Sequence, residues 1–287
     1  MAEGGALIDF GDISKPATVL IEKISNAVGI VYEPVHIKRK ARAEAEAEKI
    51  KAIARIDLNA LEHRAIERLV HQEARKQENI ESIFKKAADA LPQDANVQAL
   101  DEDWVAHFFK QCDTVSDKEM QSLWARLLSG EATTPGTFSK RTVDFVSTID
   151  KKDAALFTSL CQFVWMIGEP IPLIFDVAHS VYENRGITFA SLKHLDAIGL
   201  ISFEATTIYH RIGFTKYADM FYFGFPTRVE FPDDANNQLA AGHALLTSTG
   251  KELLAICGPE RNQEFYEYVI EQWSTKNLIL SSLLRGR

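Results

Sequence analysis

The composition of this chain is that of a soluble globular protein, and its length allows one large domain or two moderate ones. Of its 287 residues, 46% are hydrophobic and 25% are charged. The net charge of -8 disfavours a general nucleic-acid coat protein, and no apolar run approaches the roughly 20 residues that a membrane-spanning helix needs.

The cysteines and the first residues bear on cellular location. Cys112, Cys161 and Cys257 lie far apart and form no Cys-x-x-Cys pair, so neither a zinc ribbon nor a thioredoxin-like site is expected. Each stands among apolar neighbours, which is typical of a small core residue. The first residues lack the basic leader and apolar run of a secretory signal. We therefore expect a cytoplasmic protein, with peripheral contact to the inner membrane as the alternative.

Residues 1–35 are expected to form a loose, glycine-rich start followed by an amphipathic helix. Pro16 suits a first helical position, and Pro34 marks a stop. We expect the apolar face of this helix either to pack against the rest of the protein or a second copy, or to lie on a membrane. Its apolar residues are Val19, Leu20, Ile24, Ala27, Val28 and Val31.

Residues 36–92 predict a helical arm, rich in alanine and glutamate in its first part. That first part has few large apolar side chains, which is typical of a solvated helix, and we expect its basic cluster to contact an anionic partner. Further along, apolar residues recur at spacings of three and four before Pro92 ends the run. This part is interpreted as a helical hairpin or as helices packed between protomers. The basic cluster consists of Lys38, Arg39, Lys40 and Arg42.

Residues 93–168 carry the strongest helical signals and are expected to form a central helical domain. Asp101 can cap one helix, and Ser116 with Glu119 forms a capping-box pattern before the next. The apolar stripe that follows ends near Gly130, where a C-terminal stop is expected. We interpret the aromatic residues of these stripes as core. Two residues, Trp124 and Arg126, are expected to lie on or beside a central interface.

Residues 169–260 change to a mixed pattern. Leucine and isoleucine repeat at helical spacing over residues 188–198, and Gly199 supplies a left-handed stop before a strand. Three segments rich in β-branched and aromatic residues are expected to be strands: 201–203, 206–214 and 220–231.

The end of this region completes a recognisable order of elements. Thr247 can cap a helix of the pattern Leu-Thr-x-x-Gly, which ends at Gly258. A short helix, a Gly-Leu-Ile turn, a β-hairpin and this helix together resemble a winged-helix module. Residues 261–287 are expected to form a final helix.

A search for catalytic patterns gives no site. Ser248-Thr-Gly-Lys251 lacks the glycine spacing of a phosphate-binding loop, and His71-Gln-Glu73 lacks the second histidine of a zinc protease. No Gly-x-Ser-x-Gly elbow occurs. We therefore expect a non-enzymatic protein with no catalytic, cofactor-binding or metal-binding residues and no small-molecule substrate.

The winged-helix-like region is a candidate contact surface for DNA or for protein. Its expected contact residues are Ser191, Lys193, His194 and Arg211. Between residues 186 and 251, however, six acidic side chains oppose five basic ones, and phosphate neutralisation dominates nucleic-acid affinity. A protein partner is therefore favoured, and a DNA-binding transcriptional regulator is the alternative.

Three segments of the chain resemble bacterial proteins of the abortive-infection alpha (Abi-alpha) type and their relatives. They are residues 116–128 (SDKEMQSLWARLL), 139–149 and 151–157, and the Lys-Pro-Ala start at Lys15 is similar too. The resemblance implies a role in defence against phage, without an established active site. The basic arm and the aromatic hairpin depart from the simplest members.

These observations predict a mainly α protein with a smaller α+β part: an N-terminal helical arm, a central helical domain and a C-terminal winged-helix-like domain. The expected function is that of an interaction protein of an anti-phage system, which self-associates through its helices and contacts a partner through the winged-helix-like domain. A membrane-active effector that works through the first amphipathic helix is a further alternative.

Overall fold

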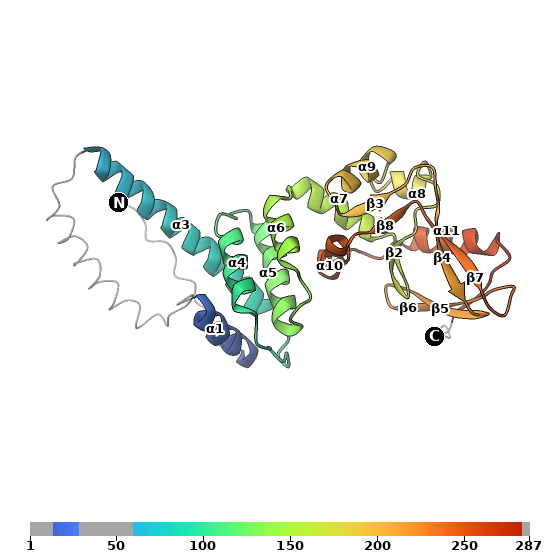
Figure 1. Cartoon of the computed structure of the whole chain (residues 1–287), viewed down its shortest axis with the longest axis horizontal. Helices are drawn as coiled ribbons and strands as arrows, with labels where there is room; N and C mark the ends of the chain where they lie inside the picture. The colour runs from blue at the N-terminus through green and yellow to red at the C-terminus, as the bar shows by residue number, and fades with distance from the viewer. Residues whose placement is uncertain (1–13, 29–59, 283–287) are drawn as a thin grey trace. The chain divides into compact units, whose positions relative to one another are not determined.

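A computed structural model describes residues 14–28 and 60–282, and the chain divides into two compact units. The first unit comprises residues 1–147 and the second residues 148–287 (Figure 1). The fold mixes α and β structure, with helices in the first unit and a sheet in the second. The expected borders at residues 35 and 36 lie outside the described residues.

The first unit is helical, and its core forms where α3 packs along α5. Phe108 of α4 makes an edge-to-face contact with Trp124 of α5, with 5.1 Å between ring centroids, and both side chains are fully buried. Such aromatic pairs add to the stability that comes from burial alone. The helices are α1 (Lys15–Val28), α3 (Ala60–Ala90), α4 (Glu102–Cys112), α5 (Lys118–Thr133) and α6 (Lys140–Thr148).

The apolar side of α1 packs inside the first unit. Ala17, Leu20 and Ile24 are buried, and Lys23 Nζ donates a hydrogen bond to the carbonyl oxygen of Val97 at 3.0 Å. These side chains lie one helical turn apart, so they share a face. These three side chains therefore pack against the protein itself, as one of the two interpretations expected.

Local signals place the starts of these helices well and one end poorly. Asp101 caps α4 as expected, since its side chain accepts from the amide of Trp104. For α5 the capping residue is Asp117 and not Ser116. Gly130 does not end α5, which continues to Thr133. Its role is to make room for the ring of Phe138, because a Cβ at residue 130 would lie 2.8 Å from Phe138 Cε2.

The second unit is built around an antiparallel sheet of five strands in the order β2-β1-β5-β6-β9. Two smaller pairs, β3–β8 and β4–β7, accompany it. Its helices are α7 (Lys151–Cys161), α8 (Ser180–Glu183), α9 (Phe189–Ala197), α10 (Ser248–Cys257) and α11 (Gln263–Ser274). Its strands are β1 (Val164–Ile167), β2 (Glu169–Pro172), β3 (Ile201–Phe203), β4 (Tyr209–Phe214), β5 (Tyr217–Tyr222), β6 (Phe225–Glu230), β7 (Asn237–Gly242), β8 (Ala244–Leu246) and β9 (Ile279–Ser282).

Aromatic side chains fill the space between the sheet and α11. Trp165 of β1 stacks on Tyr222 of β5 at 5.1 Å and meets Trp273 of α11 edge-on at 4.9 Å. All three are fully buried. This cluster joins the beginning, middle and end of the second unit in one core.

Two expectations in this unit are wrong. The segment 220–231 is not one strand, because Phe223 and Gly224 have φ values of 49° and 78° and form the turn between β5 and β6. Such a two-residue hairpin needs positive φ at both positions. The final helix ends at Ser274 and is followed by β9, an edge strand that pairs with β6.

The expected border at residue 168 falls inside the second unit. Gly168 is the turn between β1 and β2, which pair with each other from Val164 to Pro172. The two compact units meet in the chain between Ser147 and Thr148 instead. Among the helices that the structure describes, none has the length and hydropathy to cross a membrane.

Candidate interaction surfaces

The N-terminal half of α3 carries an exposed apolar stripe. We define the α3 stripe as Ala65, Ile66, Leu69 and Val70. The side chains of Leu69 and Val70 are 56% and 41% exposed, and Ile66 is half-buried. In Figure 1 this half of α3 extends beyond α4 and α5 of the same unit.

The α3 stripe continues the face by which α3 packs in the core. Each of its residues lies eighteen positions before a buried residue of the same helix, and eighteen residues make five turns. The buried counterparts, in the same order, are Ile83, Phe84, Ala87 and Ala88. The α3 stripe therefore lies on the same side of the helix as the buried residues, and the polar side chains of Glu73, Lys76 and Gln77 stand between the two.

In the second unit, α9 and its surroundings hold the residues expected to contact a partner. Ser191 is engaged at the start of the helix, where its hydroxyl accepts from the amide of Thr188 at 2.7 Å in a capping box. Lys193 Nζ donates to the carbonyl oxygen of Phe203 at 3.4 Å and lies 3.6 Å from the carboxylate of Asp196. Lys193 is thus neutralised by its own helix.

The other two expected contact residues also have acidic partners. His194 Nε2 lies 2.7 Å from Asp153 Oδ1, which belongs to α7. Arg211 Nη1 donates to Glu169 Oε1 at 2.6 Å, and this places Arg211 on β4 away from α9, against β2. The four residues therefore do not form one basic surface.

Glu169 joins two cations that are distant in the sequence. Its Oε1 accepts from Arg211 and its Oε2 accepts from Lys251 Nζ of α10 at 2.5 Å. The hydrogen bond from Lys251, reinforced by the charges of Lys251 and Arg211, holds the pKa of Glu169 below its usual range against the opposing effect of burial. Sequence analysis missed this cluster, because no local pattern links residues 169, 211 and 251.

The central pair of expected interface residues is divided between core and surface. Trp124 is fully buried against Phe108, so it belongs to the core of the first unit and not to an interface. Arg126, two positions further on α5, is exposed. The expected anionic-partner contact, Lys38, Arg39, Lys40 and Arg42, lies outside the described residues.

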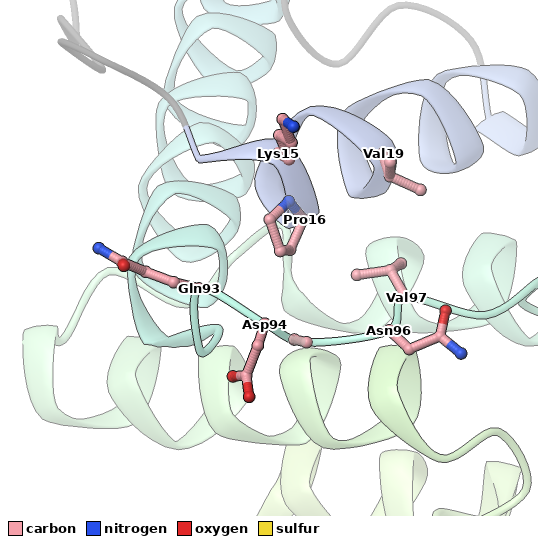
Figure 2. A pocket seen from close by; sticks show the side chains of 8 residues that line it. Lys15, Pro16, Val19, Gln93, Asp94, Asn96 and Val97 are labelled. Atoms are coloured by element: carbon pink, nitrogen blue, oxygen red, sulfur yellow. The ribbon is translucent and has the colours of Figure 1, made fainter.

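The first unit has two hollows large enough to hold a small ligand. The first, of about 270 Å³, lies between the start of α1 and the segment 93–97. Figure 2 shows Pro16 and Val19 on the side that faces this segment, while the ends of Gln93 and Asp94 point away from α1. Its polar groups do not converge.

The second hollow, of about 340 Å³, lies between α3 and the end of α4. Its polar groups bond to one another: Asn79 Nδ2 donates to the carbonyl oxygen of Asp113 at 2.8 Å, and Lys76 pairs with the Asp113 carboxylate at 3.5 Å. Across the part of the chain that the structure describes, no group of three or more His, Cys, Asp or Glu side chains is placed to hold a metal ion.

These features define the class of the molecule: an α+β protein of two compact units, one helical and one centred on an antiparallel sheet, with an exposed apolar helix face on the helical unit. Residues 63–270 match the family model described as "Protein of unknown function (DUF2806)", and the chain belongs to this family. Searches of curated proteins and of solved structures gave no match.

Proposed function

We propose that this chain is a non-enzymatic interaction protein that self-associates through the α3 stripe. The observation that carries the proposal is the exposure of Leu69 and Val70 on a face that is buried one half-helix further on. Exposed apolar side chains aligned on one helix face are typical of a surface that packs against another polypeptide.

A second copy of the same helix is the partner that fits best. Between Ala60 and Gln77, α3 carries three acidic and four basic side chains, so two such helices are close to neutral and do not repel each other strongly. Mixed charge beside an apolar stripe favours helix–helix pairing. It does not favour an anionic polymer, for which a row of cations would be needed.

Light scattering on the full-length protein tests this association. The wild type is expected to be a dimer or higher oligomer, and Leu69→Glu is expected to weaken the association at least about tenfold, since it places a carboxylate in the apolar contact. His71→Glu is the matched control, because it adds the same carboxylate at an exposed position on another face of α3. A wild type that is monomeric at working concentration would refute the proposal, and so would equal effects of the two substitutions.

We propose further that the second unit works as a winged-helix-like module that contacts a protein. In support, α8, α9 and β3 are consecutive in the chain, β8 and α10 are consecutive further on, β3 pairs antiparallel with β8, and α9 lies beside β3 (Figure 1). The strands β1 and β2 separate α7 from α8. The strands β4 and β7 pair with each other, lie between β3 and β8 in the chain, and would make the wing, whereas β5 and β6 belong to the five-stranded sheet.

Protein is favoured over DNA as the ligand of this module. Lys193, His194 and Arg211 each have an acidic neighbour within 3.6 Å, which lowers the positive potential that phosphates require. The exposed face of α9 also begins with Phe189, whose side chain is 54% exposed.

A gel-shift series on random duplex DNA separates the two ligands. We expect weak or undetectable retardation at about 0.15 M salt. Tight binding that falls steeply with salt and is lost in Lys193→Ala would replace the protein-contact proposal with that of a DNA-binding regulator.

The biological setting that we propose is bacterial defence against phage. Its support is the resemblance of residues 116–128 to the Abi-alpha helix. Plaque assays on cells that carry the gene with its native neighbours test it: the wild type is expected to lower plating efficiency, and Leu69→Glu to restore it. Equal plating with and without the gene over a broad phage panel would contradict this setting and leave the self-association result unaffected.

A further inference from the structure

Two cysteines that are far apart in the sequence meet at the ends of two packed helices. Cys161 is the last residue of α7 and Cys257 is the last residue of α10, and α10 packs against α7 within the second unit. Their thiols lie within hydrogen-bonding reach of each other. Contact of this kind between two thiols is the first requirement for a disulfide.

The two thiols differ in access to solvent. Cys161 is 1% exposed, whereas Cys257 is half-buried. Burial, together with the neighbouring Cys257 sulfur, raises the pKa of Cys161 well above its usual range. Cys257 is therefore the thiol that a dissolved reagent meets first, and Cys161 is the thiol placed to react next.

We propose that Cys161 and Cys257 form a redox-active thiol pair that closes to an intramolecular disulfide with a low-molecular-weight disulfide such as oxidised glutathione. The inference is independent of the proposed self-association, because it concerns only the second unit. The resulting bond would tie the end of α7 to the end of α10.

The exchange proceeds in two balanced steps. The Cys257 thiolate attacks the small disulfide, so a bond forms between Cys257 Sγ and one sulfur while the other sulfur leaves as a thiolate. The Cys161 sulfur then attacks Cys257 Sγ and displaces the second small thiolate, and the Cys161 proton passes to a departing thiolate. Two protein thiols are oxidised, one small disulfide is reduced to two thiols, and these take up the two protons.

Intact-mass spectrometry of the native full-length protein after incubation with oxidised glutathione tests the proposal. The wild type is expected to lose two hydrogen atoms, and peptide mapping is expected to find Cys161 joined to Cys257. A reducing agent should reverse the change. Cys112→Ser is the matched control and should behave as the wild type, because Cys112 is a buried cysteine of the first unit.

Single substitutions test the order of the two steps. Cys161→Ser should stop at one glutathionyl group on Cys257, whereas Cys257→Ser should remain almost unmodified because Cys161 is shielded. A wild type that keeps a stable glutathionyl group on Cys257, that is unchanged after incubation, or that forms the link only after denaturation would overturn the proposal. The wild-type result alone decides this, even where a variant fails to fold.

The disulfide also has a physical readout. Because it restricts the unfolded chain, the oxidised second unit is expected to unfold at a higher urea concentration than the reduced one. An unchanged or lower midpoint in the linked protein would show that the bond distorts the native packing of α7 against α10 and would count against a pair built for closure.

Discussion

Gly242, at the end of β7, lies where the backbone of one strand passes directly over another segment. Its φ is 94°, and a Cβ at this position would stand 2.3 Å from the carbonyl oxygen of Ile174. The neighbouring His243 amide donates to that same oxygen at 2.9 Å. Both the backbone conformation and the close approach therefore require glycine.

We predict that Gly242→Ala lowers the free energy of unfolding by at least about 3 kcal/mol, since strain and a backbone clash add together. Gly213→Ala is the matched control. Its φ is 86°, but among the described residues no atom lies within 4 Å of the added Cβ, so a loss of only about 1–2 kcal/mol is expected from strain alone. Urea denaturation measures both, and similar losses in the two variants would show that the approach to Ile174 is not tight.

The lowered pKa of Glu169 predicts how the stability of the folded protein changes at acid pH. Because its pKa is lowered in the folded state by Lys251 and Arg211, the stability it contributes is present above the ordinary glutamate pKa of about 4.3 and is lost as pH falls through the lowered value. The wild type should lose more stability than Glu169→Gln when pH falls from about 6 to about 3. Denaturant midpoints measured across this range give the difference. Glu260→Gln, at an exposed position of the second unit, should follow the wild type.

At the scale of the element, the start of α5 shows which of two neighbouring residues, Ser116 or Asp117, caps the helix. Asp117 Oδ1 accepts from the amides of Glu119 and Met120, both at 3.0 Å. Ser116 lies one residue outside and receives a long hydrogen bond of 3.4 Å from Arg75. The capping-box pattern located the helix start to within one residue, but it could not choose between two adjacent residues that both cap well.

Asp117→Ala is therefore expected to destabilise the first unit by about 1 kcal/mol, because two helix-start amides lose their acceptor. Ser116→Ala should cost no more than a few tenths of a kcal/mol. Thermal unfolding of the two variants measures the difference. The reverse order would restore Ser116 as the capping residue.

Elements that end in a tertiary contact were predicted less well. The stop expected at Gly130 ignored Phe138, whose ring occupies the space a side chain would take. The hairpin turn at Phe223 was missed because phenylalanine is uncommon at positive φ, and its aromatic neighbours favoured one continuous strand. Similarly, spacing predicts the apolar residues of α3, but it does not say which of them other parts of the protein cover.

At the scale of the whole molecule, each compact unit has a core of its own. The first is centred on Phe108 and Trp124, and the second on Trp165, Tyr222 and Trp273. A unit that buries its own aromatic core has the main requirement for independent folding.

We predict that residues 148–287 fold when expressed alone. The expected result is a cooperative urea transition and a near-ultraviolet circular dichroism signal from the packed tryptophans. Trp165→Ala in the same fragment is the comparison and should lose about 3–5 kcal/mol, because it empties the centre of the cluster. A fragment with no cooperative transition would show that the second unit depends on the first.

The sequence by itself determined features whose interactions span a few residues. The caps at Asp101 and Thr247, the left-handed glycines at Gly199 and Gly258, and the short strand 201–203 all follow from hydrogen bonds and steric limits between near neighbours. Such interactions are visible in a short window of sequence, and their physical cause lies inside that window.

Only the tertiary structure decided which distant residues meet. It buried Trp124, brought Glu169 between Arg211 and Lys251, split the aromatic run into β5 and β6, and placed Cys161 beside Cys257. These contacts join residues that are up to about a hundred positions apart, and they depend on how whole helix and sheet faces pack to remove apolar surface from water. That outcome is a property of the complete core, and no local spacing of residues specifies it.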